Sequence, residues 1–560
     1  MTGGTQSHAL GSSRCPAINE VLTEAPCKRS KVNAKQLTLL LATVLIAGIA
    51  LTPLLAMIAA SIKIDGKISF FHYQTLLSSG RAWRLLGHSV ALSFLTSLCA
   101  GALGMPLGVL LGQTNLPFRR AFAFLFTIPL LVPPYVIAVA WSAILGREGW
   151  LAYLTGGITA ETTSAWLFGL PGCVLVLTTA FIPVVMLLTI AYLYTVNPRL
   201  EEAGRLVARW PWVLRGITLP MIRPGLLLSA GLVFLLVLGE FSVPMYLRYD
   251  VFPVETLTQF SAFYDFGAAT ASALPLALIT LIVLMVERLL LRAPMKPMSL
   301  TSNETGARLI RLGATRGVWF LWVGGVSVVL IFLPLTVLFL QASPTDYREA
   351  LSRAGDSLLR SLLYATVGAT LLSGLGFFCG YLVNTQALRA WRAVDFLTLF
   401  LLVVPSPVIG IGLIGLWNHP ATNWIYSTPA MILFGYLAQY TALTSRITAA
   451  TLVQIPPSME EAASLTGAGW FHRVCHIIAP LARPGLVAAW LVAYIFCLRD
   501  SGVAMVVYPP GQDTLPVRIF TLMANSPEGL VAALCLLLIA ATLLPLGGLG
   551  LILKTWGRTP

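Results

Sequence analysis

The sequence predicts an all-α polytopic membrane protein with twelve transmembrane helices, arranged as two parallel halves of six. Composition is the first reason: 57% of the 560 residues are hydrophobic and only 10% are charged, too little polar surface for a soluble globule of this length. The second is that apolar runs of about 20 residues, long enough to cross about 30 Å of hydrocarbon, recur along the chain. The third is a polar loop that occurs twice.

The apolar runs have the length of helices rather than of the alternating strands of about 10 residues that build a membrane barrel. The twelve predicted spans are residues 37–61, 88–112, 121–145, 172–195, 225–247, 269–291, 318–341, 360–384, 393–417, 427–450, 485–508 and 529–553.

The repeated loop lies between the fourth and fifth span of each half. It covers residues 196–226 and returns at 455–486, with 259 residues between Glu202 and Glu461 and 260 between Pro224 and Pro484. An even number of spans per half makes the two halves enter the membrane in the same direction, so the repeat is parallel. A second match, residues 252–257 with 509–515, follows the fifth span of each half.

These boundaries divide the chain into an N-terminal tail (1–36), a first six-helix half (37–291), a linker (292–317) and a second six-helix half (318–560). The excess of Lys and Arg in the tail, the repeated loops, the linker and the C-terminus predicts that all of them are cytoplasmic. The net charge of +14 reflects this bias and attraction to anionic membrane lipid, and no soluble basic domain indicates a nucleic-acid partner.

Each repeated loop has the local signals of a helix-turn-helix. Pro198 and Pro457 are expected to stop the preceding helix, Gly467 to allow a sharp turn, and Pro480 to end a second short helix. Paired acids precede the turn, Glu201 and Glu202 in the first copy and Glu460 and Glu461 in the second, where they complement the positive end of a helix.

Aromatic residues follow the acids in both copies: Trp210 and Trp212 in the first, Trp470 and Phe471 in the second. A projecting, apolar-faced unit of this kind suits docking into a groove on a partner protein. The alternative is that these residues are ordinary interfacial aromatics at a membrane surface.

The second copy reads Glu461-Ala462-Ala463, then Gly467, then Ile477 and Pro480, with Ala479 at a position where Leu is usual. This pattern resembles the cytoplasmic coupling motif of binding-protein-dependent ABC importer permeases. The first copy departs from it, because Glu202-Ala203 is followed by Gly204 and Ala208 stands where Gly is expected.

The resemblance implies the type I ABC importer permease fold, and coupling to an ATPase through both loops. The coupling residues it implies are Glu201, Glu202, Ala203, Ala208, Ile217, Pro220, Glu460, Glu461, Ala462, Ala463, Gly467, Ile477 and Pro480.

The chain has no phosphate-binding loop of its own, since the only Gly-Lys pair, Gly66-Lys67, lacks the preceding Gly and the following Ser or Thr. The resemblance therefore implies a transport subunit with no catalytic residues and no bound cofactor. ATP is hydrolysed by a separate ABC ATPase subunit, expected in two copies, and solute arrives on a periplasmic or extracellular binding protein. The implied location is a bacterial inner (plasma) membrane, crossed many times.

Ionisable residues within the spans are candidates for the substrate path, because they are costly in a membrane. Glu240 and Asp500 lie 260 residues apart, at equivalent places in the fifth span of each half, with Arg499 beside the second. Each is about 15 residues beyond Gly225 or Gly485, which puts it about 22 Å along a helix, in the outer half of the membrane. They either face the path between the halves or are interfacial charges, with Asp500 paired to Arg499.

Spans three and nine share proline pairs, Pro133 with Pro134 and Pro405 with Pro407. Prolines interrupt the internal hydrogen bonds of a helix, and the freed carbonyls need cover from protein or water at membrane depth. These segments either line the central path or are packing kinks. The histidines form no ligand cluster, so no metal site is expected.

The double-length plan is most similar to the iron(III) transport permeases, while permeases for thiamine and 2-aminoethylphosphonate share it. A secondary transporter is expected to place ionisable groups near the midplane and to lack a duplicated cytoplasmic loop. A membrane-embedded enzyme needs a nucleophile and base at catalytic spacing, which the sequence does not have.

Overall fold

The computed structural model describes residues 34–64, 67–263, 265–290 and 310–556, and these are almost entirely helical. Most of the predicted N-terminal tail and residues 292–309 of the predicted linker lie outside the described residues. One short antiparallel hairpin, β1 (Lys63–Ile64) with β2 (Lys67–Ile68), follows the first long helix.

The N-terminal half forms one series of helices and π turns. Its elements are α1 (Ala34–Ile46), η1 (Ala47–Leu51), α2 (Thr52–Ser61), α3 (Phe71–Ser78), α4 (Gly80–Gln113), α5 (Arg119–Leu131), α6 (Pro134–Leu145), α7 (Trp150–Leu154), α8 (Ala160–Leu167), α9 (Leu170–Leu193), α10 (Pro198–Val207), α11 (Trp210–Val213), η2 (Leu214–Thr218), α12 (Leu219–Leu238), α13 (Ser242–Tyr246), α14 (Phe252–Ser261) and α15 (Phe266–Leu290).

The C-terminal half repeats this order after a short 3-10 turn, η3 (Gly313–Thr315). Its elements are α16 (Arg316–Ser327), η4 (Val328–Phe332), α17 (Leu333–Gln341), α18 (Pro344–Thr385), α19 (Trp391–Val403), α20 (Ser406–Trp417), α21 (Asn423–Tyr426), α22 (Ala430–Leu452), α23 (Pro457–Leu465), α24 (Trp470–Arg473), η5 (Val474–Ile478), α25 (Ala479–Arg499), α26 (Gly502–Val507), α27 (Leu515–Leu522) and α28 (Glu528–Trp556).

The two halves share even their irregular turns. The π turn η2 begins at Leu214, directly after α11. The π turn η5 begins 260 residues later, at Val474, directly after α24. The first long helix of each half also contains a π turn, η1 or η4.

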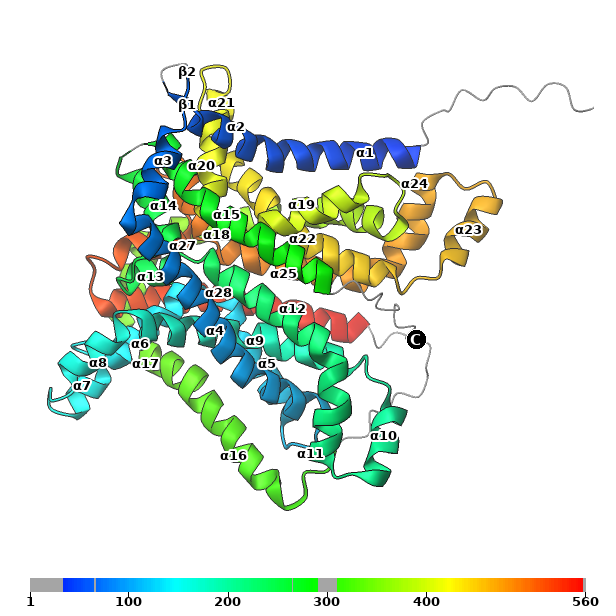
Figure 1. The fold of residues 1–560 in the computed structure, drawn as a ribbon, viewed down its shortest axis with the longest axis horizontal. Helices are drawn as coiled ribbons and strands as arrows, with labels where there is room; N and C mark the ends of the chain where they lie inside the picture. The colour runs from blue at the N-terminus through cyan, green and yellow to red at the C-terminus, as the bar shows by residue number, and fades with distance from the viewer. Residues whose placement is uncertain (1–33, 65–66, 264, 291–309, 557–560) are drawn as a thin grey trace, which may run out of the picture.

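The first long helix of each half packs on the opposite half. Helices α1 and α2 contact α18 and α20, whereas α16 and α17 contact α5 and α6. In Figure 1 they run along opposite edges of the molecule, α1 along one and α16 along the other. This exchange of helices ties the two halves together on both sides of the bundle.

Within the described residues, nine helices are long and apolar enough to cross a membrane, or up to eleven if each of two bent pairs is one crossing. The bent pairs are α5 with α6 and the segment after it, at 101°, and α19 with α20, at 109°. They replace the straight spans expected at 121–145 and 393–417, and the proline-containing segments at their centres are where the helices break.

The span expected at 427–450 is α22, a helix of 23 residues that the count of nine does not include. Its polar side chains are shielded by protein: Gln439, Thr441 and Thr444 are all buried where α22 packs between α18 and α25. The structure therefore supports a polytopic helical protein without fixing twelve crossings.

The spans expected at 225–247 and 485–508 are wrong at both ends. The helices begin much earlier, at Trp210 and Trp470, and run unbroken to Leu238 and Arg499. Each is then interrupted before a short helix, α13 or α26. The carboxylates of Glu240 and Asp500 lie in these interruptions.

The expected roles of three prolines are also corrected. Helices α9 and α22 end before Pro198 and Pro457, which are instead the first residues of α10 and α23. Pro480 ends no helix, because π turn η5 leads into α25 without a break. The wider π turn relieves the clash between a proline ring and the carbonyl one turn earlier.

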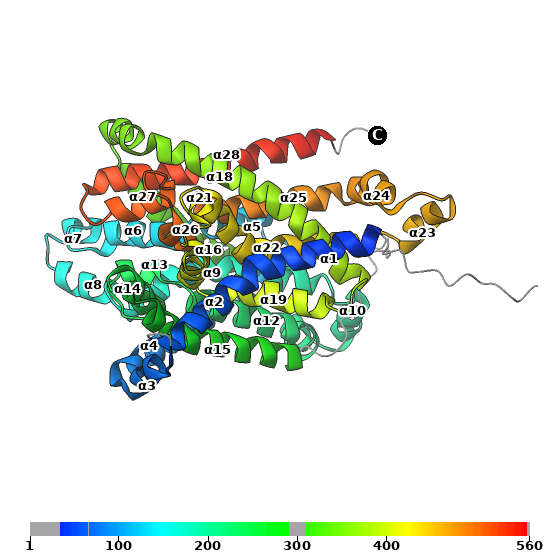
Figure 2. The ribbon, with the colours of Figure 1, turned by 90° about the horizontal axis from the view of Figure 1, so that it is seen from above.

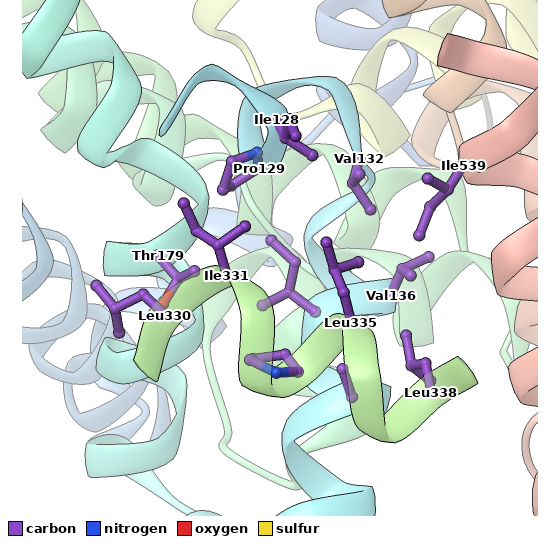
Figure 3. A pocket seen from close by; sticks show the side chains of 13 residues that line it. Ile128, Pro129, Val132, Val136, Thr179, Leu330, Ile331, Leu335, Leu338 and Ile539 are labelled. Carbon is purple, nitrogen blue, oxygen red and sulfur yellow. The ribbon is translucent and has the colours of Figure 1, made fainter. Parts of the chain in front are cut away.

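A small apolar pocket of about 30 Å³ lies where η4 and α17 cross onto the N-terminal half. Figure 3 shows Leu330, Ile331, Leu335 and Leu338 of the crossing segment opposite residues of the α5–α6 bend. The lining is almost entirely hydrocarbon, so this pocket is a feature of the helix exchange and contains no ionisable group.

Candidate functional site

Interrupted helices from both halves surround one polar cavity. Its volume is about 90 Å³, and it is lined by residues from the α5–α6, α12–α13, α19–α20 and α25–α26 junctions. The lining residues at these junctions are Pro134, Gly239, Glu240, Phe241, Ser242, Val403, Val404, Ser406, Arg499, Asp500, Ser501 and Gly502. The two predicted acids, their neighbouring arginine and one predicted proline therefore share a site.

Two glycines allow the halves to approach closely here. A Cβ atom on Gly239 would lie 3.2 Å from the carbonyl oxygen of Val403 in the opposite half. A Cβ atom on Gly502 would lie 2.3 Å from Cβ of Ser406 and 3.3 Å from the ring of Phe241. The junctions of the two halves are thus in direct contact at the cavity.

Both acids cap the short helix that follows them. Glu240 Oε1 accepts hydrogen bonds from the backbone N–H of Ser242, at 2.9 Å, and from its hydroxyl. Asp500 Oδ2 accepts from the backbone N–H of Ala504 at 2.9 Å, and its Oδ1 accepts from the Tyr440 hydroxyl at 2.7 Å. A negative charge at a helix N-terminus is stabilised by the helix dipole, so these caps help to hold two carboxylates inside the protein.

Arg499 uses partners other than Asp500. Its Nη1 donates a hydrogen bond to the backbone carbonyl of Leu130, next to the α5–α6 break, and its guanidinium lies 4.4 Å from the centre of the Phe496 ring. Its charge also attracts those of Asp500 and Glu240, so Arg499 joins the two acids to a contact between the halves.

A side-chain amide donates hydrogen bonds to the backbone carbonyls at the α19–α20 break. Gln439 Nε2 donates to the carbonyls of Leu402 and Val404, both at 3.2 Å. Its amide oxygen is buried and has no hydrogen-bond partner, although the residue is only 4% exposed and lines the cavity. Protein groups thus cover the carbonyls freed at both proline breaks, as the sequence requires.

The predicted prolines divide between lining and flanking positions. Pro134 begins α6 and lines the cavity, with Pro133 as the residue before that helix. Pro405 precedes α20 and lies against Gly239, while Pro407 is the second residue of α20.

The two repeated loops form projecting helical units at one end of the molecule, α10 with α11 and α23 with α24 (Figures 1 and 2). Trp212 is 71% exposed and Phe471 53% exposed, whereas Trp470 is buried. The apolar surfaces of the units continue along the first helices, where Leu206, Val207 and Leu465 are almost fully exposed.

The paired acids of each loop have different environments. Glu201 and Glu460 lie in the first turn of their helices, are half-buried, and bond to groups of the membrane bundle. Glu202 and Glu461 are exposed. Ala203 and Ala462 lie beside them and are exposed as well, while Ala463 is half-buried.

The turns explain the departures of the first copy. Gly467 has φ +82°, the left-handed conformation that favours glycine, whereas Ala208 is extended with φ −140°. The first loop turns without a left-handed residue, so it needs no glycine there. A Cβ on Gly204, where the second copy has Ala463, would approach the terminal methyl of Ile217 to 2.6 Å, so the Ile217 side chain would have to shift.

The remaining predicted residues lie where each unit joins the long helix that follows it. Ile217 and Ile477 lie in the π turns and are half-buried, and Pro220 and Pro480 are exposed near the start of α12 and α25.

Sequence reasoning missed the neutral partners of these charges. Tyr440 and Gln439 at the cavity, and Gln113 and Tyr381 beneath the loops, are not ionisable at neutral pH and belong to no motif. Their one visible signal is polarity within an apolar run, and α22, which carries Gln439 and Tyr440, is not among the nine candidate crossings.

The sequence pattern of the family described as "Binding-protein-dependent transport system inner membrane component" matches this chain twice, over residues 104–294 and 373–554. The chain belongs to this family of transport permeases. The two matches also establish the internal repeat, and the family assigns the protein to the inner membrane as a transport subunit without an ATPase domain.

Curated relatives include ferric permeases. The chain is 24% identical over 468 residues to the "Putative ferric transport system permease protein FbpB 1" of Haemophilus influenzae, covering 80% of this chain and 73% of that protein. It is 25% identical over 461 residues to the "Ferric transport system permease protein FbpB" of Actinobacillus pleuropneumoniae, covering 78% of this chain and 66% of that protein, just under two thirds.

A shorter relative matches one part of the chain. The "Putative 2-aminoethylphosphonate transport system permease protein PhnV" of Salmonella typhimurium is 26% identical over 252 residues, covering 41% of this chain and 92% of that protein.

Proposed function

We propose that this chain is the permease of an ATP-driven importer that moves iron(III), couples to two copies of an ABC ATPase through α10–α11 and α23–α24, and receives cargo from a separate binding protein. The observation that carries the coupling role is the pair of projecting helical units, repeated with their π turns at the same end of a duplicated bundle. In this proposal that end and both termini are cytoplasmic.

The exposure pattern supports docking over an interfacial role for these units. Membrane-surface aromatics would place their apolar faces against lipid around the bundle. Here Leu206, Val207 and Leu465 project with the exposed acids Glu202 and Glu461 on helices that extend beyond the bundle end. A mixed apolar and acidic surface of this kind fits a groove on a soluble subunit.

The polar cavity is the proposed substrate path. Its position between the interrupted helices of both halves suits alternating access, because small movements of the halves change its opening. The carboxylates of Glu240 and Asp500 lower the electrostatic cost of a passing cation, and Arg499 limits how tightly the cation is held. A secondary transporter would share such a cavity but would have no use for the duplicated loops.

Cargo identity rests on the ferric relatives and on the acidic lining of the cavity. Anionic 2-aminoethylphosphonate, suggested by the shorter relative, would meet two carboxylates against one guanidinium there. Uptake of radiolabelled iron(III) and of 2-aminoethylphosphonate into cells expressing the complete importer separates the two proposals directly.

Coupling is tested by reversing the charge of the exposed acids. Glu461→Lys should abolish uptake and release the ATPase during purification while the permease stays in the membrane, because it places a cation near a helix N-terminus on the docking surface. Glu202→Lys should have a milder effect. Glu161→Lys is the matched control, since Glu161 is an exposed acid in the first turn of α8 at the opposite end of the bundle.

Wild-type uptake together with wild-type recovery of the ATPase in the Glu461→Lys variant would rule out the coupling assignment.

A further inference from the structure

Tyr381 connects three elements beneath the second repeated loop. It lies near the end of α18 and is 2% exposed. Its hydroxyl donates a hydrogen bond to Glu460 Oε1 of α23 at 2.9 Å, and the same oxygen accepts from Trp470 Nε1 of α24 at 3.3 Å. The ring of Trp470 packs edge-on against it, with the centroids 6.0 Å apart.

The third element is the N-terminal helix. The Lys35 ammonium lies 5.0 Å from the centre of the Tyr381 ring, and α1 also packs along α18 and α24. A cation over an aromatic face is attracted by the ring quadrupole. A helix of the N-terminal half therefore contacts the residue that anchors the loop of the C-terminal half.

The first loop has an anchor of the same kind but different chemistry. Glu201 Oε1 accepts from Gln113 Nε2, at the end of α4, at 3.2 Å and from the Thr218 hydroxyl at 2.6 Å. In each half the long helix α4 or α18 thus holds the first acid of the pair. An amide and a hydroxyl replace the tyrosine, so the first anchor has no ring on which a cation can sit.

We propose that Tyr381 is a positioning residue that makes the second coupling unit, and not the first, respond to the N-terminal helix α1. The first acid of each pair, Glu201 or Glu460, fixes the unit to its bundle. Movement of α1 alters the contact of Lys35 with Tyr381, and through it the seating of α23 and α24.

The consequence is a built-in difference between the two coupling units. The hydroxyl of Tyr381 bonds to a carboxylate, and such charge-assisted bonds are stronger than neutral ones. The weaker cation–π contact of Lys35 with the same tyrosine adds a smaller stabilisation, which changes when α1 moves. This inference rests on the proposed coupling role for its effect on transport, but the seating of α23 is measurable without the ATPase.

The first measurement is hydrogen exchange of residues 457–465 in the full-length permease alone, in lipid nanodiscs. Tyr381→Phe keeps the ring and removes the hydroxyl, so exchange in α23 should accelerate about tenfold. Lys35→Gln should accelerate it about two- to fivefold, and Lys35→Arg, which keeps a cation over the ring, should leave it near wild type. Exchange in α10 should not respond to Lys35→Gln.

The matched control is Gln113→Ala, which removes an anchor of the first loop. It should accelerate exchange in residues 198–207 and leave residues 457–465 unchanged. A Tyr381→Leu background, which has no aromatic ring, should abolish any effect of Lys35→Gln, because interacting sites are not additive.

The second measurement is ATP hydrolysed per solute imported by the complete importer, which a merely structural defect with lower yield does not change. Tyr381→Phe should raise this ratio several-fold at equal protein level.

Unchanged α23 exchange in Tyr381→Phe would show that Tyr381 does not anchor the second loop. Equal responses of α10 and α23 to Lys35→Gln would show that α1 does not act selectively on that loop. The Lys35 variants decide the matter even if Tyr381→Phe fails to assemble. A failure of the coupling proposal itself appears instead as normal uptake in Glu461→Lys, with the exchange results unaffected.

Discussion

The guanidinium of Arg499 donates a hydrogen bond to the backbone carbonyl of Leu130, joining the break at the end of α25 to the break between α5 and α6. One residue of the C-terminal half thus supplies the donor that a proline-interrupted helix of the N-terminal half lacks. The bond crosses the interface that we propose as the substrate path. We therefore expect the bond to help hold the two halves together at this interface.

Replacing Arg499 with Gln should loosen this closure. The variant removes the charge and shortens the side chain, and a bond from a charged donor contributes on the order of 2 kcal/mol. We expect a measurable passive leak of solute from proteoliposomes without ATP, together with reduced driven uptake. Arg499→Lys should be intermediate, since it keeps the charge but has no planar fork.

The control for this change is Arg353→Gln. Arg353 is about half exposed and pairs with Glu349 within α18 at 2.6 Å, so its removal should cost less than about 1 kcal/mol. Tight proteoliposomes and full uptake in Arg499→Gln would show that the bond to Leu130 plays no part in closure.

The two capping acids are expected to act on one site. Glu240→Gln and Asp500→Asn each keep an oxygen that can accept the capping bond while removing the charge. If the charges assist a cation, each change should lower uptake about tenfold without loss of the ATPase, and the double variant should lose less than the product of the two.

A purely structural role predicts a different pattern for these acids: two small, independent losses of folded protein. Asp395→Asn, which removes an acid paired to Arg446 outside the cavity, is the control. Wild-type uptake by the double variant at equal protein level would show that neither acid takes part in transport.

Close packing at the cavity gives a third prediction. Gly502→Ala places a methyl group 2.3 Å from Ser406 Cβ of the facing junction, so the junctions have to separate. Overpacking of this kind costs about 1–3 kcal/mol. The purified variant should unfold at a lower temperature and transport more slowly.

Gly415→Ala in α20 is the matched control, because a Cβ there has nothing within 4 Å. Equal thermal stability of the two variants would contradict the close approach of the α19–α20 and α25–α26 junctions at Gly502.

The sequence predicted the parts of the fold that depend on composition and repetition. The family, the helical class, the internal repeat and the transport role are confirmed. The continuation of Trp210 and Trp470 into long helices was missed because Pro480 was taken to end a helix, and a π turn is not visible in composition. The interruptions at Glu240 and Asp500 were missed because short runs of apolar residues follow them.

The candidate site was partly visible for a physical reason. Charged residues in apolar runs stand out, so Glu240, Arg499 and Asp500 were found, and the structure brings them to one cavity. Tyr440, Gln439 and Tyr381 act through hydrogen bonds between segments distant in sequence, such as the 79 residues separating Tyr381 from Glu460. A single sequence holds no record of such pairings.

The last prediction concerns the orientation of the protein in the membrane. The distribution of Lys and Arg predicts that the repeated loops are cytoplasmic, so a cysteine at Ser464 should react only with reagents that reach that side. Thr256, in the middle of α14, is expected on the other side but is fully buried, so Ser261, exposed at the end of the same helix, is the better site for labelling from outside. Cys475 is exposed in the second loop and has to be replaced with Ser first. Labelling of Ser464 from outside intact cells would invert the topology, leave the loops without access to cytoplasmic ATPase, and thereby exclude the coupling proposal as well.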